Sequence, residues 1–236
     1  MSGFIETLMP NIIAYWDQFT QALTATVQMF LLAGILSFLF GLLFGVLLII
    51  TQPTGIAPNK AVYRIVDTVV NVFRSIPFVI LLIFLIPLTR AIVGTAIGVK
   101  GAIIPLVFGC VPFYTRQVET ALADVDPGKI EAARAMGIST PNIVFHVYLH
   151  EAVPELIRVT TTTAISLIGL TTMAGAVGAG GIGSFAINYG QSQHHQDIVN
   201  VCVIVLLVIV SLIQTLGNVL ARKTTNRALI RRKIKQ

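Results

Sequence analysis

A short charged segment between two long apolar stretches carries the residues of this chain best suited to bind another protein. Residues 127–137 read Pro-Gly-Lys-Ile-Glu-Ala-Ala-Arg-Ala-Met-Gly. Asp126 and Pro127 are typical of a helix start, and Gly137 is typical of a helix end. Along this helix a carboxylate and a guanidinium can make charged contacts, while the alanines let a partner approach closely. We therefore predict a docking element, in which Glu131 and Arg134 make the charged contacts and Ala132, Ala133 and Ala135 form the surface that a partner approaches. The alternative is an amphipathic helix that lies on a membrane.

The docking helix is the first half of a longer polar loop, residues 126–154. Thr140 followed by Pro141 repeats the helix-start signal. Residues 142–149 then predict a second short helix that ends near Pro154. The loop is thus predicted to contain a helix, a glycine turn and a second helix.

A second group of residues shares one face of the helix predicted at 156–179. At about 100° per residue, these side chains fall on a stripe roughly 80° wide. They are small or mildly polar, and the methionine is the one long, flexible side chain among them: Thr162, Ser166, Gly169, Met173, Ala176 and Gly180. In lipid such a face turns toward protein or water. The stripe is therefore either a helix-packing seam or part of a substrate path.

Histidines are the natural candidates for metal binding or acid–base catalysis, but their setting here favours neither. His146 and His150 lie in the polar loop, whereas His194 and His195 lie between two apolar segments. The chain contains no H-E-x-x-H metal motif. We predict no catalytic residue and no metal site in this chain.

The sequence also argues against nucleotide binding by this chain. Residues 178–183 fit the pattern G-x-G-x-x-G, but that fingerprint requires a preceding strand, and here it ends an apolar segment. No G-x-x-x-x-G-K-S/T loop is present. We therefore expect this chain to bind no cofactor itself.

Composition predicts a membrane protein. The 236 residues are 55% hydrophobic and 11% charged, with a mean hydropathy of +0.86, which is more apolar surface than a soluble domain of this length can bury. A membrane helix needs roughly 20 apolar residues. The apolar part of the third candidate span covers only about 14 residues, a length at which a re-entrant segment is an alternative. The prediction is an all-α, polytopic protein with a single domain, residues 1–236, and five spans at 21–50, 66–88, 101–122, 156–179 and 198–220.

Basic residues predict the orientation, because cytoplasmic flanks of membrane helices collect Lys and Arg. Of the 16 Lys and Arg residues, all but Arg90 and Lys100 fall on one side. This pattern places the N-terminus outside, and the loop 126–154 and a basic tail, 221–236, in the cytoplasm. The net charge of +6 then suits anionic lipid headgroups and not nucleic acid. Arg116 and Glu119 are spaced for an ion pair near the inner end of the third span, where snorkelling is favoured over substrate contact.

The polar loop resembles a known family. Glu-Ala-Ala, three further residues and Gly, at 131–137, resemble the cytoplasmic coupling motif of ABC importer permeases, through which a separate ATPase moves the membrane subunit. The resemblance implies that the ATPase contacts Glu131, Ala132, Ala133 and Gly137. The consensus ends in Leu and Pro, where this chain has Leu149 and His150. Pro154 is then the nearest helix breaker, so the departure affects the exit of the loop.

Further runs resemble the methionine-importer branch of these permeases. They are Arg-Ser-Ile-Pro-Phe at 74–78, Ile-Pro-Leu-Thr-Arg at 86–90, Ile-Val-Gly-Thr at 92–95 and Met-Ala-Gly-Ala-Val-Gly at 173–178. The resemblance implies an ABC type I importer permease fold in the cell membrane and import of methionine and its derivatives. It implies a homodimer, two copies of a cytoplasmic ATPase that binds ATP and Mg, and an extracytoplasmic methionine-binding protein or lipoprotein. It also places a gate at Met173. If the stripe is part of a substrate path, Thr162, Ser166 and Gly169 line that path beside the gate.

Other functions remain as alternatives. A permease for another amino acid, an oligopeptide or an oxyanion would share the same motif, although the neutral stripe favours a neutral or zwitterionic substrate. A secondary transporter or channel would place ionisable groups near the bilayer midplane, where this chain has none. An intramembrane enzyme would need a better setting for its histidines.

Overall fold

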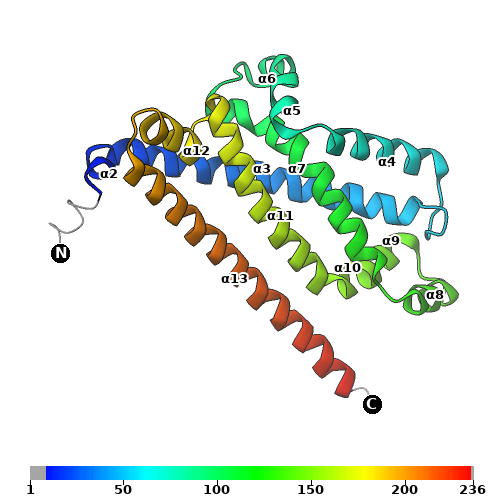
Figure 1. The fold of residues 1–236 in the computed structure, drawn as a ribbon. Helices are drawn as coiled ribbons and strands as arrows, with labels where there is room; N and C mark the ends of the chain where they lie inside the picture. The colour runs from blue at the N-terminus through cyan, green and yellow to red at the C-terminus, as the bar shows by residue number, and fades with distance from the viewer. Residues whose placement is uncertain (1–8, 235–236) are drawn as a thin grey trace. The chain divides into compact units, whose positions relative to one another are not determined.

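The computed structural model describes residues 9–234, with side chains described as far as residue 225. Within this range the chain forms helices and π-helical turns, and no strand (Figure 1). The predicted basic tail is 221–236, and the side chains of its residues 226–236 therefore lie outside the described part of the chain. The helices before the polar loop are α2 (Pro10–Ala14), α3 (Trp16–Thr51), α4 (Lys60–Ser75), α5 (Phe78–Phe84), α6 (Ile86–Val93) and α7 (Gly98–Ala123).

Short elements follow α7 and connect it to two further long helices. The π-helical turns carry the label η. The elements are α8 (Pro127–Ala135), α9 (Thr140–Ile143), η1 (Val144–Tyr148), α10 (Leu149–Glu151), α11 (Val153–Ala174), η2 (Gly175–Ala179), α12 (Gly181–Phe185), η3 (Ala186–Gln191) and α13 (Gln196–Ile234).

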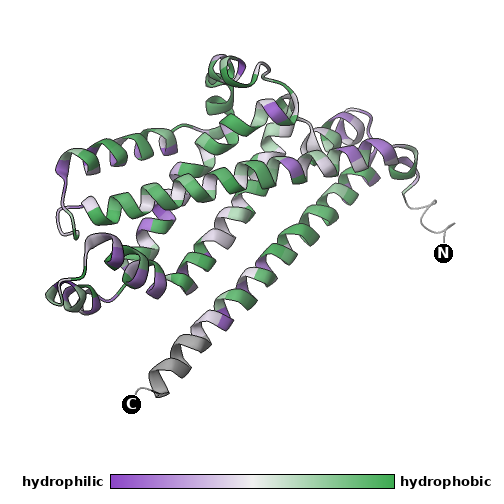
Figure 2. Ribbon diagram, turned by 180° about the vertical axis from the view of Figure 1, so that it is seen from behind, coloured by the Kyte–Doolittle hydropathy of each residue, from purple (hydrophilic) through white to green (hydrophobic). Residues whose placement is uncertain are grey.

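Among the described residues, four helices are long and apolar enough to cross a membrane: Trp16–Thr51, Gly98–Ala123, Val153–Ala179 and Gln196–Thr225. Figure 2 shows hydrophobic residues along most of α3 and α13. The third predicted span lies within α7, one continuous helix of 26 residues. At 1.5 Å per residue α7 is about 39 Å long, which exceeds the ~30 Å of a hydrocarbon core.

The segment expected as the second span, 66–88, is not one straight helix. It contains parts of α4 and α6 and all of α5, and α4 and α5 meet at an angle of 106°. The break falls at Pro77, which has no N–H to donate and disfavours helical geometry at the preceding residue. A membrane crossing in this segment therefore consists of a bent pair of helices.

The chain divides into two compact units, each assembled from three separate segments. Unit 1 comprises Met1–Leu36, Ile76–Gly109 and Ala164–Leu212, and unit 2 comprises Ser37–Ser75, Cys110–Thr163 and Ile213–Gln236. The single domain expected over 1–236 stays a prediction beside this division into two units. The continuous helices α3, α7, α11 and α13 each contribute residues to both.

Unit 2 has an apolar core in which α3 packs closely on α7. A Cβ atom at Gly41 would lie 2.5 Å from Cδ1 of Tyr114, and one at Gly45 would lie 2.5 Å from Cγ1 of Val118. The Gly-x-x-x-Gly spacing on α3 therefore permits this contact. Tyr114 is 1% exposed, and its hydroxyl is 2.7 Å from that of Thr160.

Unit 1 has its own core, which joins α2 and the start of α3 to α12, η3 and α13. The cluster includes Phe19, Phe185 and Ile198. Both the backbone N–H and the side-chain amide of Asn11 donate to Asp197, each at 3.0 Å. These contacts fix α2 to the start of α13.

Candidate functional site

The docking helix, α8, has the capped ends that its sequence predicts. Asp126 is the N-cap, and its Oδ1 accepts a hydrogen bond from the Gly128 N–H at 2.9 Å. At the other end, the Gly137 N–H donates to the Arg134 carbonyl at 2.9 Å. Gly137 has φ +71°, a left-handed conformation that favours glycine. The helix therefore begins and ends at fixed residues.

One face of α8 is buried within unit 2. Ala133 is 2% exposed and belongs to the same apolar cluster as Leu122, Ile143 and Tyr148. It therefore differs from the sequence expectation, which placed it on the contact surface. A short helix that packs against the rest of its own chain buries one face. The motif alone does not show which of its alanines lies on that buried face.

The opposite face of α8 is open. Glu131, Ala132 and Gly137 are exposed, as predicted for contact residues. The most exposed large apolar side chains of the loop are Met136 at 71% and Phe145 at 65%. The coupling motif specifies neither residue type, because Met136 is one of its three variable positions and Phe145 lies beyond it. The sequence could have indicated these two residues as contact residues only because they are large and apolar within a polar loop.

An ion pair and a buried tyrosine connect α8 to the second half of the loop. Lys129 of α8 pairs with Glu151 of α10. Tyr148 of η1 is 5% exposed, and burial raises the pKa of its hydroxyl, an effect that the positive charge of Arg134 partly offsets. The Tyr148 hydroxyl is therefore neutral at physiological pH. The ion pair and the burial of Tyr148 together show that α8 is part of a folded loop.

The exit of the loop is irregular, as the departure from the family consensus suggested. The predicted second helix consists of α9, the π-helical turn η1 and α10, and α11 begins at Val153, just before Pro154. His150 lies exposed in α10, where the consensus has proline. Inserted π turns of this kind are frequent at functional sites.

The predicted stripe on α11 is not covered by other described parts of the chain. Thr162, Ser166, Gly169, Met173 and Ala176 are all exposed, and Met173 is 43% exposed. A Cβ atom at Gly169 would meet nothing within 4 Å. By contrast, Leu167, Ile168, Thr171 and Ala174 on other sides of the helix are buried. The remaining stripe residue, Gly180, is partly buried. The stripe's role as a packing seam or part of a substrate path stays a prediction.

The glycine-rich run after Met173 is a helix break. Gly178, Gly180 and Gly181 have φ between +80° and +94°, and only glycine adopts such angles without strain. A Cβ atom at Gly181 would lie 2.7 Å from Oγ1 of Thr26, and the same hydroxyl oxygen accepts a hydrogen bond from the Ile182 N–H at 2.8 Å. The run thus lets α12 approach α3 closely.

The histidines are not gathered into a metal site within the described range. No group of three or more His, Cys, Asp or Glu side chains there could hold a metal ion. His146 Nδ1 lies 3.2 Å from the Asn142 carbonyl oxygen, in its own helical turn.

Fold and loop together define a class of protein. This is a polytopic, all-helical membrane permease in which a capped helix with an exposed, alanine-rich face lies between two long helices.

Residues 41–228 match the family described as binding-protein-dependent transport system inner membrane component. The chain belongs to this family. It is therefore a multi-pass inner membrane protein and a transport subunit, not an enzyme.

Similar proteins carry related names. A probable D-methionine transport system permease protein of Vibrio cholerae serotype O1 is 39% identical over 222 residues, 92% of this chain and 99% of the relative. A methionine import system permease protein of Bacillus subtilis is 45% identical over 174 residues, 74% of this chain and 78% of the relative.

A solved structure has the same fold. One chain of the MetNI methionine ABC transporter, in an inward-facing conformation, has a TM-score of 0.87 and 43% identity, covering 89% of this chain and 98% of its own. The predictions of an all-α importer-permease fold and of membership among ABC importer permeases are therefore confirmed.

Proposed function

We propose that this chain is the transmembrane subunit of an ATP-driven importer that moves methionine, and related derivatives, into the cytoplasm. The observation that carries the proposal is the folded loop between α7 and α11. Its helix α8 is capped at both ends and anchored by Ala133, while Glu131 and Ala132 remain exposed. A small, rigid, exposed helix in a membrane protein is suited to receive force from a partner.

The proposed partner at this loop is a cytoplasmic ABC ATPase, present in two copies, which binds ATP and Mg. Glu131, Ala132 and Gly137 form the contact surface, to which the exposed Met136 and Phe145 add apolar area. Ala133 supports this surface from its buried side. The further partners are a second copy of this chain and an extracytoplasmic methionine-binding protein or lipoprotein.

The proposed orientation follows from the basic residues. With the N-terminus outside, the loop 126–154 and the C-terminus lie in the cytoplasm, where an ATPase can reach α8. Arg90 and Lys100 are then the only Lys or Arg residues outside.

The proposed translocation path follows the stripe on α11. Thr162, Ser166 and Gly169 line it, and Met173 is the gate because it is the one long side chain on the stripe. All four are exposed in the single chain, so they are free to face a path between two copies. The stripe carries no ionisable group, which suits a substrate with no net charge.

Methionine is the proposed substrate because permeases named for methionine transport are 39% and 45% identical to this chain. The test is uptake of labelled L-methionine by cells that lack this chain but keep its partners. We expect wild type to restore uptake and Glu131→Lys to fail, since a reversed charge on the exposed face of α8 opposes docking.

Asp124→Lys is the matched control. Asp124 is exposed just before α8, and its replacement by lysine changes the charge by the same amount as Glu131→Lys. Uptake should survive in this variant. Equal uptake with Glu131→Lys and wild type would argue against α8 as the coupling element. If wild type restores uptake of another amino acid but not of methionine, the proposal of an importer stands and the proposed substrate is wrong.

A further inference from the structure

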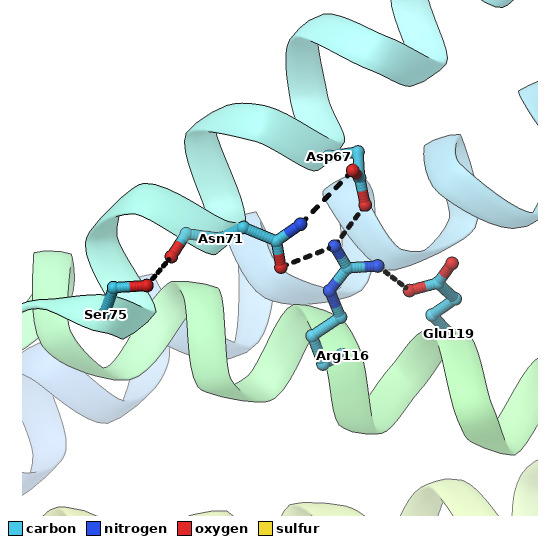
Figure 3. A network of polar contacts seen from close by, with 5 residues as sticks. All are labelled: Asp67, Asn71, Ser75, Arg116 and Glu119. Carbon is cyan, nitrogen blue, oxygen red and sulfur yellow. Dashed lines mark hydrogen bonds and ion pairs between the residues drawn. The ribbon is translucent and has the colours of Figure 1, made fainter.

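A cluster of charged and polar side chains joins α4 to α7 inside unit 2, centred on Arg116 (Figure 3). The Arg116 guanidinium donates from Nη1 to Oε2 of Glu119 at 2.6 Å and from Nη2 to Oδ1 of Asn71 at 2.9 Å. The same Nη2 forms an ion pair with Asp67. The cluster therefore contains two partners from α4 and one from α7.

The cluster extends along α4 through Asn71. Its side-chain amide Nδ2 donates to Oδ2 of Asp67 at 3.2 Å, and its backbone carbonyl oxygen accepts from the Ser75 hydroxyl at 2.8 Å. Ser75 is the last residue of α4, before the sharp bend at Pro77. A continuous set of polar contacts thus runs from Arg116 to the end of α4.

These charges lie within helices of a membrane protein and are partly buried. The side chains of Arg116, Asp67 and Glu119 are 21%, 30% and 17% exposed. Ionisable groups in membrane segments are costly, and those that occur are paired and functional. The sequence predicted only the spacing of Arg116 and Glu119. It gave no sign of the partners on α4, which lie more than 40 residues earlier.

Only arginine can make these contacts at once. Its planar fork directs separate N–H groups to Glu119 and to the pair Asp67 and Asn71, whereas a lysine ammonium is a single point charge on a flexible stem. Replacement by lysine therefore keeps the charge but removes the bridge between the two helices.

The place of Arg116 along the chain relates the cluster to the docking loop. Arg116 lies in the last two turns of α7, which ends at Ala123, and α8 begins only a few residues later at Pro127. Val118, Leu122 and Val125 join this end of α7 to Ala133 of α8 in one apolar cluster. No residue of α4 belongs to that cluster, and α4 is connected to the same end of α7 through Arg116.

We propose that Arg116 is a positioning residue that makes α4 move together with α7 when the docking loop is displaced. The inference rests on the proposed function, because it supposes that an ATPase acts on α8. Asp67, Asn71 and Glu119 hold the guanidinium in place. Loss of the bridge leaves the ATPase able to dock but transmits its movement poorly, so that ATP is hydrolysed without a matching amount of transport.

The test uses the wild-type permease and its ATPase partner in proteoliposomes, with labelled L-methionine and the binding protein. Arg116→Lys should lower methionine uptake per ATP hydrolysed by about fivefold or more, the low end of ordinary coupling free energies. Arg64→Lys is the matched control, since Arg64 is an exposed arginine of α4 with no ion pair among the described side chains. Its uptake per ATP should equal that of wild type.

A double-mutant cycle separates coupling from simple loss of stability. If Asp67 acts through Arg116, then Asp67→Asn combined with Arg116→Gln should lower uptake per ATP no further than Arg116→Gln alone. An unchanged ratio in Arg116→Lys would overturn the proposal, as would a proportional fall of both rates with a lower melting temperature. If wild type itself shows no ATP-driven methionine uptake, the proposed function fails, independently of Arg116.

Discussion

At the scale of single residues, close packing of α3 on α7 depends on two glycines. A Cβ atom at Gly45 would lie 2.5 Å from Cγ1 and 2.7 Å from Cβ of Val118, and 3.0 Å from the Thr115 carbonyl oxygen. A branched side chain and a backbone atom have little room to move away. We expect Gly45→Ala to lower the free energy of unfolding by about 1–3 kcal/mol, as overpacking does in other cores. Thermal unfolding in detergent would measure the loss.

Gly34→Ala on the same helix is the control for this prediction. Its added Cβ would lie 3.4 Å from one methyl group of Leu167, an ordinary contact. The control should keep or slightly raise the melting temperature, because alanine favours a helix over glycine by about 1 kcal/mol. Equal melting temperatures for the two variants would mean that α3 and α7 can move apart at Gly45 without loss of stability.

Residue patterns predicted part of the site and missed part of it. The capped ends of α8 and the exposure of Glu131 could be predicted, since both follow from local chemistry. The burial of Ala133 could not, because it depends on Ile143 and Tyr148, which fold back from later in the loop. The partners of Arg116 on α4 were missed for the same reason, since a pair far apart in sequence leaves no periodic signal.

At the scale of elements, the sequence predicted the helical segments better than their continuity. Apolar length was enough to find α3, α7, α11 and α13. It did not show that α4 and α5 meet at 106°, although Pro77 is the physical cause of the break. The glycines after Met173 break the helix, but their close contact with Thr26 could not be predicted from the sequence.

The contact between Thr26 and α12 gives a prediction at this scale. Thr26 is 2% exposed, and its Oγ1 accepts from the Ile182 N–H at 2.8 Å. Thr26→Val removes the acceptor and leaves a buried N–H without a partner, at a cost of about 1–3 kcal/mol. The Ile182 amide should then exchange its hydrogen at least several-fold faster, as measured by hydrogen–deuterium exchange with mass spectrometry.

Thr24→Val is the comparison for this effect. Thr24 is exposed, and its hydroxyl donates only to the Thr20 carbonyl, within the same helix, at 2.8 Å. Exchange at Ile182 should therefore match that of wild type. Equal exchange rates in the Thr26 and Thr24 variants would show that the glycine run holds α12 in place without the threonine.

At the scale of the whole molecule, the exposed surface indicates what must cover it. The most apolar part of α13 is only 11% buried within the chain, against 50% for α7. Lipid or a second copy must cover the rest, because apolar surface of this extent is not left in water. The stripe on α11 differs from these surfaces in being small and mildly polar. Such a surface is poorly suited to lipid and well suited to a path between two copies.

The proposed gate gives the last prediction. Met173 is 43% exposed at the end of α11, directly before the helix breaks. If it closes the path, Met173→Ala should open a gap and let methionine leak across proteoliposomes without ATP, so that uptake per ATP falls. Met173→Leu keeps a large apolar side chain, so we expect no methionine leak in this variant, since swaps of similar volume are tolerated. If Met173→Ala leaves both the leak and ATP-coupled uptake as in wild type, the side chain only fills space, and the gate lies elsewhere on the stripe.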